Sequence, residues 1–283
     1  MIIDVLKTKI EEYSPKETLE QENVLHEIIQ HYVLASLSRS GIFSEVIFHG
    51  GTCLRIVSGT NRFSEDLDFL VKAPNPEFRW QKYLDRVGED CAQEGIDFEL
   101  IDKSKISTVV QKAFLKTDSI GKILSLNLPF DRRNVKKIRI KLEIDTNPPA
   151  GSKFETSYIT FPSIAPLTTQ TLESGFANKI HALLCRSYTK GRDWYDFVWY
   201  VSHKIQPNFT LLQNAVFQQG PWAGEVLNVT KEWFENTLEN TIRTIDWNIA
   251  QQDVMRFLPH NEQRGIQEWS VDFFLYQLSK MKT

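Results

Sequence analysis

The stretch from Lys137 to Asp145 constrains the fold more than any other part of the chain. Its apolar residues alternate strictly with charged ones: Ile138, Ile140, Leu142 and Ile144 against Arg139, Lys141, Glu143 and Asp145. Successive residues of a β-strand point to opposite faces of a sheet. We therefore expect a strand with one face covered by a hydrophobic core and one face reached by water.

Other segments complete a mixed α/β N-terminal part. Short apolar runs predict strands at 46–48, 66–71, 96–101 and 123–128, with an edge strand at 154–161. Helical spacing of apolar residues predicts helices at 16–39 and 76–94.

From about residue 166 the pattern becomes helical, with segments at 171–188 and 193–201. Six of the seven tryptophans lie at or beyond Trp194, and tryptophans at helical spacing are usually core residues. The sequence thus predicts an α+β protein with a mixed-sheet domain at residues 1–165 and a helical domain at 166–283.

Composition excludes several classes of protein. The 283 residues are 41% hydrophobic and 24% charged, which is typical of globular proteins and excludes a disordered or fibrous chain. No apolar stretch approaches the ~20 residues that span a bilayer, and charges interrupt the N-terminus too early for a secretory signal. The three cysteines match neither a zinc spacing nor a disulfide framework. We expect a cytoplasmic location; the net charge of −3 indicates no partner.

Two adjacent glycines, Gly50 and Gly51, lie between a predicted strand and a predicted helix, with Thr52 directly after them. Glycine lets the backbone approach a bulky group closely, and amides at a helix N-terminus bind anions such as phosphate. Thr52 can add a hydroxyl contact or cap the helix. A plain turn is the alternative for the two glycines, and we expect the preceding His49 to be structural.

Asp66 and Asp68 follow at the start of the next predicted strand, two residues apart, so both carboxylates leave the same face. Such carboxylates repel unless a cation lies between them, and Mg²⁺ carried in with a nucleotide suits oxygen ligands. Solvated surface charge is the alternative. Glycines for the phosphate and a carboxylate pair for its metal together predict phosphoryl or nucleotidyl transfer.

These two motifs resemble a known family. Gly50-Gly51-Thr52-x-Leu54-Arg55, followed by residues 63–69 (FSEDLDF), is similar to the signature of the AbiEii/AbiGii nucleotidyltransferase toxins of the DNA polymerase β-like superfamily. The resemblance extends to residues 179–182 (KIHA) and 191–196 (GRDWYD), and so covers most of residues 45–200.

The resemblance implies a small nucleotidyltransferase sheet and a helical lobe, with a nucleotide between them. Members act as toxins of toxin–antitoxin or phage-defence pairs, and some transfer nucleotides to tRNA. By resemblance, Asp66 and Asp68 are metal ligands for Mg²⁺ or Mn²⁺, and the glycines with Thr52 hold phosphate. Lys179 contacts the nucleotide phosphates, and Asp196 is a catalytic acidic group.

In the superfamily a third carboxylate on a neighbouring strand often completes the site. We predict Asp145 for that role, because it ends the alternating strand on the same face as Lys141 and Glu143. The alternative is that these three residues form a solvated face of the sheet.

Several cations have two interpretations. Lys179 lies in an apolar helix and can contact phosphate or extend to water. We assign Arg192 to the nucleotide-binding set, with a surface ion pair to Asp196 as the alternative, and Asp193 can simply cap its helix. Arg55 and Arg62 flank the glycines as candidate triphosphate clamps.

The run 132–141 places six cations in ten residues, which suits an RNA backbone or guards a sheet edge against aggregation. The leading hypothesis is a nucleotidyltransferase toxin that uses a nucleoside triphosphate, with tRNA as acceptor and an antitoxin partner. The alternatives are a small-molecule acceptor, a non-catalytic nucleotide-binding module, and a sugar transferase with an Asp-x-Asp motif.

Overall fold

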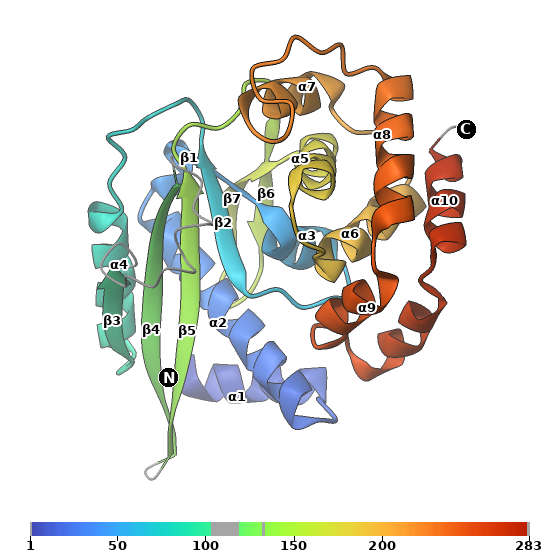
Figure 1. Ribbon diagram of the computed structural model, residues 1–283. Helices are drawn as coiled ribbons and strands as arrows, with labels where there is room; N and C mark the ends of the chain where they lie inside the picture. Colours follow the sequence, from blue (N-terminus) through green and yellow to red (C-terminus); the bar gives the residue numbers. More distant parts are fainter. Residues whose placement is uncertain (1, 103–118, 132–133, 282–283) are drawn as a thin grey trace. The chain divides into compact units, whose positions relative to one another are not determined.

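The computed structural model describes residues 2–102, 119–131 and 134–281 (Figure 1). Contacts divide the chain into two units. Unit 1 comprises residues 1–59, 63–148 and 155–169, and unit 2 comprises residues 60–62, 149–154 and 170–283. The domain boundary predicted at residue 165 falls at the start of a strand, β7, and two short segments from earlier in the chain belong to unit 2.

In the described part of unit 1, seven strands form one mixed sheet in the order β3-β4-β5-β2-β1-β7-β6. Strand β1 pairs antiparallel with β2 and parallel with β7, and β2 pairs parallel with β5. The strands are β1 (Val46–His49), β2 (Asp66–Val71), β3 (Asp97–Asp102), β4 (Ser119–Asp131), β5 (Asn134–Asp145), β6 (Phe154–Ile159) and β7 (Ala165–Gln170).

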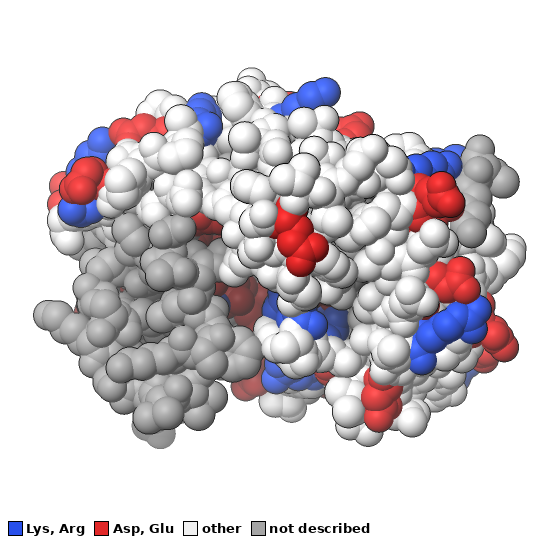
Figure 2. All heavy atoms as spheres, turned by 45° about the horizontal axis from the view of Figure 1, so that its top comes forward, with Lys and Arg blue, Asp and Glu red and all other residues white. Residues whose placement is uncertain are grey.

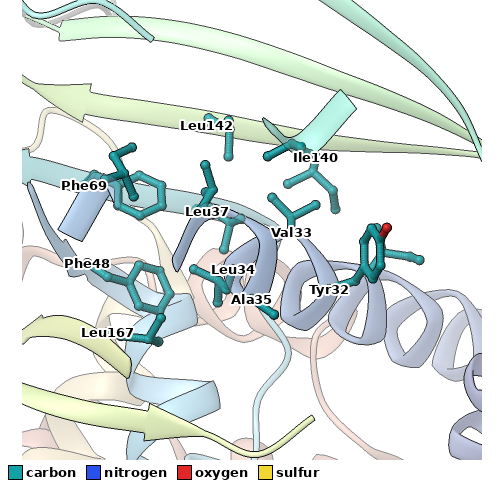
Figure 3. Packing of buried hydrophobic residues seen from close by; sticks show 14 of the residues in the cluster. Tyr32, Val33, Leu34, Ala35, Leu37, Phe48, Phe69, Ile140, Leu142 and Leu167 are labelled. Carbon is teal, nitrogen blue, oxygen red and sulfur yellow. The ribbon is translucent and has the colours of Figure 1, made fainter. Parts of the chain in front are cut away.

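Strand β5 has the predicted alternation: Ile138, Ile140, Leu142 and Ile144 are buried, whereas Lys141, Glu143 and Asp145 are half-buried. Strand β2 alternates in the same way, with Leu67 and Phe69 in the core. The core faces of these strands pack against helix α2 (Thr18–Arg39), as Figure 3 shows for Val33, Leu37 and their neighbours in β2 and β5. The opposite face of β2 and β5 therefore carries the charged residues.

The other helices of unit 1 lie along the same sheet. They are α1 (Ile2–Tyr13), α3 (Gly50–Ser58) and α4 (Gln81–Gln93), with a 3₁₀ turn at Ile42–Ser44. Helix α4 begins five residues later than the predicted 76–94 helix, although Phe78 and Trp80 before it are buried as expected. Helix α1 was not predicted from the sequence. Strand β7 was also not predicted, because its sequence, Ala-Pro-Leu-Thr-Thr-Gln, has little apolar character. It is a strand through its pairing with β1.

Unit 2 is helical, as predicted, and its core is aromatic. Trp194 lies edge-on to Trp247 and to Phe274, with ring centroids 5.0 and 5.2 Å apart, and Trp247 stacks on Phe274 at 4.0 Å. Its helices are α5 (Leu172–Cys185), α6 (Gly191–Ser202), α7 (Phe209–Gln218), α8 (Lys231–Thr244), α9 (Trp247–Met255) and α10 (Val271–Lys280), with a 3₁₀ segment at His260–Glu268. The overall class is therefore α+β.

Charges of both signs are intermingled on the face shown in Figure 2, where Lys and Arg side chains lie beside Asp and Glu. The basic run 132–141 lies largely outside the described side chains, because Arg132 and Arg133 are not described and the side chains up to Lys137 are not either. Within the residues that the structure describes, no helix combines the length and the apolar character that crossing a membrane requires.

Candidate functional site

The turn between β1 and α3 brings the first glycine against the second aspartate. Gly50 has φ = +81°, a conformation that side chains rarely adopt. A Cβ atom added to Gly50 would lie 2.5 Å from Oδ2 of Asp68, which is too close for any real contact. The register explains this proximity, because His49 at the end of β1 pairs with Asp68 in β2. The sequence therefore needs glycine here both for the turn and for the approach of the carboxylate.

Thr52 connects the same helix to the first aspartate. Its side chain is buried, and its hydroxyl donates a short hydrogen bond to the backbone carbonyl of Asp66. The residue at the N-cap of α3 is His49, so Thr52 does not cap the helix. Thr52 thus fixes the first turn of α3 against the start of β2, and Gly51 is buried in that turn. The contact of Thr52 with phosphate stays a prediction.

Strands β2 and β5 form an acidic face, which we define as the side chains of Asp66, Asp68, Lys141 and Glu143. In the parallel register Asp66 lies beside Lys141, and Asp68 lies beside Glu143. The ammonium of Lys141 lies 2.7 Å from Oε1 of Glu143 and 3.5 Å from Oδ2 of Asp66. The side chains of Asp66, Lys141 and Glu143 are about 30% exposed, so water and solutes reach them.

Glu143, which the sequence analysis did not select, is the carboxylate that pairs in register with Asp68, and the assignment of Asp145 as the third carboxylate stays a prediction. Asp145, which we predicted as the third carboxylate, pairs in register with Leu70, and its Oδ1 accepts a hydrogen bond from the backbone amide of Asn147. It lies two residues beyond Glu143, about 7 Å along the strand. The alternation placed both residues on the correct face, but only the β2–β5 register shows which of them is beside Asp68.

The acidic face attracts cations. Burial alone would lower the pKa of Lys141, but the carboxylates of Asp66 and Glu143 raise that pKa above its ordinary value. Among the described residues, no three His, Cys, Asp or Glu side chains lie close enough to form a metal site by themselves. The ammonium of Lys141 lies between the carboxylates of Asp66 and Glu143 instead. Carboxylate oxygens are the donors that Mg²⁺ prefers. The chemistry of these oxygen donors suits a hard divalent cation, but their arrangement does not form a site for one by itself.

Arg55, a predicted phosphate ligand, has a protein partner. Its Nε lies 2.6 Å from Oε2 of Glu27, a buried residue of α2, and its guanidinium lies over the ring of Phe63 at 4.6 Å. Glu27 also accepts a hydrogen bond from the hydroxyl of Tyr13. In this structure Arg55 connects α3 to α2, and its role in phosphate binding stays a prediction.

Unit 2 contains a buried ionic network, which we define as Arg62, Lys179, Asp193 and Asp196, with Arg186 at its edge. Asp196 is fully buried and accepts two hydrogen bonds from Arg62, at 2.5 Å from Nε and 2.6 Å from Nη2. Lys179 lies 2.8 Å from Oδ2 of Asp196 and 2.9 Å from Oδ1 of Asp193. Burial would raise the pKa of Asp193, but Lys179 and neighbouring cations hold it well below its usual range.

This network gives Arg62 and Lys179 partners that the sequence did not indicate. Arg62, a candidate triphosphate clamp, is 2% exposed and pairs with Asp196. The alternative pair of Arg192 with Asp196 is replaced by this one. Arg192 instead lies over the ring of Phe257 at 4.1 Å, and its backbone amide bonds to Asp253. Lys179 is 14% exposed, and its ammonium contacts the buried carboxylates of Asp193 and Asp196.

The predicted site residues therefore form two groups, each within one unit. Unit 1 brings together the glycine turn, Thr52 and the acidic face, and unit 2 brings Lys179 together with Asp193 and Asp196.

Comparisons with known proteins identify the family of the chain. Residues 32–276 match the model of a family described as nucleotidyl transferase AbiEii toxin, type IV toxin–antitoxin system. No curated protein sequence matches.

Two solved structures match most of this chain, and JHP933 shows the likeness in fold. JHP933 from Helicobacter pylori is 19% identical, with a TM-score of 0.51, and the match covers 92% of this chain and 89% of that one. A second H. pylori protein, described as a nucleotidyltransferase, is 18% identical, with a TM-score of 0.49 and coverage of 90% and 92%.

Proposed function

We propose that this chain, which belongs to the AbiEii family of nucleotidyltransferase toxins, transfers a nucleotide from a nucleoside triphosphate to RNA. The acceptor is tRNA, and pyrophosphate is released. The observation that carries this proposal is the approach of Gly50 to the carboxylate of Asp68. It joins a turn suited to phosphate and an acidic face suited to a metal within one unit. The reaction is an in-line attack by an acceptor hydroxyl on the α-phosphate.

Asp66, Asp68 and Glu143 would each supply an oxygen to the divalent cation, Mg²⁺ or Mn²⁺, and phosphate oxygens of the nucleotide would supply the rest, since these side chains alone do not form a metal site. The cation supplies positive charge that stabilises the attacked phosphate and the leaving group. The three side chains leave the same face of adjacent parallel strands, and Gly50 supports the carboxylate of Asp68 from one side. Thr52 holds the backbone of Asp66, so the ligand set is attached to a rigid strand rather than to a loop.

The triphosphate would be bound by the amides at Gly50 and Gly51, where the N-terminus of α3 favours negative charge. Arg55, in the same helix, would supply further positive charge, and the assignment of Lys179 and Arg192 to the nucleotide stays a prediction from the sequence. We assign Asp196 the task of holding Lys179 and Arg62, because its carboxylate is fully buried and paired with both of them. A buried, paired carboxylate touches no acceptor directly, so the acceptor proton would pass to Glu143 or Asp145.

The decisive experiment measures transfer of labelled nucleotide to total RNA with Mg²⁺ present, using each of the four nucleoside triphosphates. Asp68→Asn should reduce labelling by at least a hundredfold, because it removes a metal ligand without changing side-chain size. Asp85→Asn is the matched control, since Asp85 is exposed on α4 and should leave labelling unchanged. Equal labelling by Asp68→Asn and the wild type would discard the metal assignment.

Two further arms separate the alternatives. Glu143→Gln should abolish labelling. If Asp145→Asn loses more labelling than Glu143→Gln, the third carboxylate is Asp145, the residue first predicted. Label that appears on a small molecule of a metabolite extract, and not on RNA, would indicate the small-acceptor alternative. Nucleotide binding without pyrophosphate release would indicate a binding module.

As a member of a toxin family, the protein would have an antitoxin partner and would act on tRNA in the cytoplasm as part of phage defence.

A further inference from the structure

The acidic face already contains a cation that belongs to the protein. The ammonium of Lys141 lies 2.7 Å from Glu143 and 3.5 Å from Asp66, and Lys141 comes from the same strand as Glu143. Both carboxylates are residues to which the proposed function assigns the metal. The ammonium of Lys141 therefore neutralises the carboxylates of Glu143 and Asp66, which a divalent cation would need as ligands.

The position of Lys141 follows from the β2–β5 register. Lys141 pairs with Asp66, and Glu143 is two residues further along β5 on the same face. The backbone therefore fixes where the side chain starts, and its four methylene groups let the ammonium move. The side chain is 31% exposed, so the ammonium can leave for solvent without opening the core.

The geometry points to Lys141 as a built-in competitor of the metal: its ammonium neutralises the acidic face until a metal–nucleotide complex displaces it. This inference rests on the proposed function, since it takes Asp66 and Glu143 as metal ligands. It adds a regulatory property of that site. The carboxylates are held together without a metal, and the affinity for metal alone is kept low.

Two consequences follow from simple electrostatics. Like charges at close range repel, so without Lys141 the three carboxylates destabilise the fold when no metal is bound. The same loss removes the competing positive charge, so a divalent cation binds more tightly. A lysine that stabilised the fold from a position away from these carboxylates would produce the first effect and not the second. The pair of effects with opposite signs is therefore the signature of competition.

The test measures Mn²⁺ binding to the full chain by the loss of the electron paramagnetic resonance signal of free Mn²⁺. Lys141→Met removes the charge but keeps most of the side-chain length. We expect its affinity for Mn²⁺ to rise at least tenfold, equivalent to about 1.4 kcal/mol. Lys141→Arg keeps the charge and should bind Mn²⁺ as weakly as the wild type. Unchanged or weaker Mn²⁺ binding by Lys141→Met would overturn the inference.

Lys82→Met is the matched control. Lys82 forms a similar ion pair with Glu45, at 2.9 Å, but it is 65% exposed and lies on α4. This variant has the same change in net charge and should bind Mn²⁺ like the wild type. An equal gain in both variants would mean a general effect of charge and would contradict a specific competition.

Thermal unfolding supplies the second measurement. Lys141→Met should melt below the wild type in EDTA, and saturating Mn²⁺ should remove or reverse that difference, because tighter binding stabilises the folded state more. Asp68→Asn distinguishes the two proposals. If Asp68→Asn binds Mn²⁺ normally, the metal assignment of the proposed function fails. If it loses Mn²⁺ while Lys141→Met binds like the wild type, only the competition fails.

Discussion

Asp196 illustrates how burial changes the meaning of a charged residue. Its carboxylate is fully buried, accepts two hydrogen bonds from Arg62 and lies 2.8 Å from the ammonium of Lys179. Breaking a buried ion pair leaves the partner charge without compensation, which costs far more than losing a pair at the surface. Arg62 lies in the sequence between α3 and β2, so the pair holds a residue of this short connection within unit 2.

We expect Asp196→Asn to lower the free energy of unfolding by about 3–5 kcal/mol, because Arg62 and Lys179 lose a buried counter-charge. Glu239→Gln is the control. Glu239 pairs with Arg243 on α8 with both side chains well exposed, so its replacement should cost less than about 1 kcal/mol. Urea denaturation measures both values. A stable Asp196→Asn variant that fails in nucleotide transfer would instead support the direct catalytic role first predicted for Asp196.

At the level of elements, the close packing of α6 on α9 depends on a single missing side chain. Gly191 begins α6, and a Cβ atom there would lie 1.8 Å from the backbone oxygen of Ala250 in α9. A backbone carbonyl cannot rotate away as a flexible side chain can. The glycine in the GRDWYD motif is therefore explained by helix packing, whereas Gly50 is explained by the turn and by the carboxylate of Asp68.

Gly191→Ala should destabilise unit 2 by about 3 kcal/mol or more, since overpacking against a backbone forces the two helices apart. Gly265→Ala provides the comparison, because no atom lies within 4 Å of its Cβ position. That variant should change the free energy of unfolding by less than about 1 kcal/mol. Tryptophan fluorescence during urea unfolding reports on unit 2, which contains six of the seven tryptophans. A Gly191→Ala variant as stable as the wild type would show that α6 and α9 separate readily.

At the scale of the whole molecule, pH acts through two half-buried histidines of α2, His26 and His31. Burial lowers the pKa of His31 below its ordinary value of about 6.5, and Lys9 and Arg55 act in the same direction against Glu27. Burial also lowers the pKa of His26. The folded chain therefore binds fewer protons than the unfolded chain just below pH 6.5. Stability is complete above that pH and falls as the pH decreases towards the folded-state pKa values.

Urea denaturation at a series of pH values between about 8 and 5 should show this decline beginning near pH 6.5. His31→Gln should flatten the decline in part, because the contribution of His26 remains. His203→Gln is a suitable control, since His203 is on the surface of unit 2. If His31→Gln and the wild type lose stability in parallel as the pH falls, His31 is not a source of the acid sensitivity.

The sequence by itself determined the features that depend on short stretches of chain. The alternation in 137–145 predicted which face of β5 is buried, and the spacing of Asp66 and Asp68 predicted that their carboxylates share a face. The glycine turn and the acidic pair were also enough to indicate the AbiEii family, which the match over residues 32–276 confirmed. Local backbone geometry fixes which face of a strand a side chain leaves, so no distant partner is needed to predict it, whereas the family was indicated by the resemblance of the motifs.

Only the tertiary structure decided which residues face one another. Glu143 rather than Asp145 lies beside Asp68 because of the β2–β5 register, which joins residues 75 positions apart. Asp196 pairs with Arg62 across 134 positions, rather than with the nearby Arg192. Local spacing specifies the face of an element. The identity of a charge partner depends on which elements pack together, and that is set by burial of the core over the whole chain.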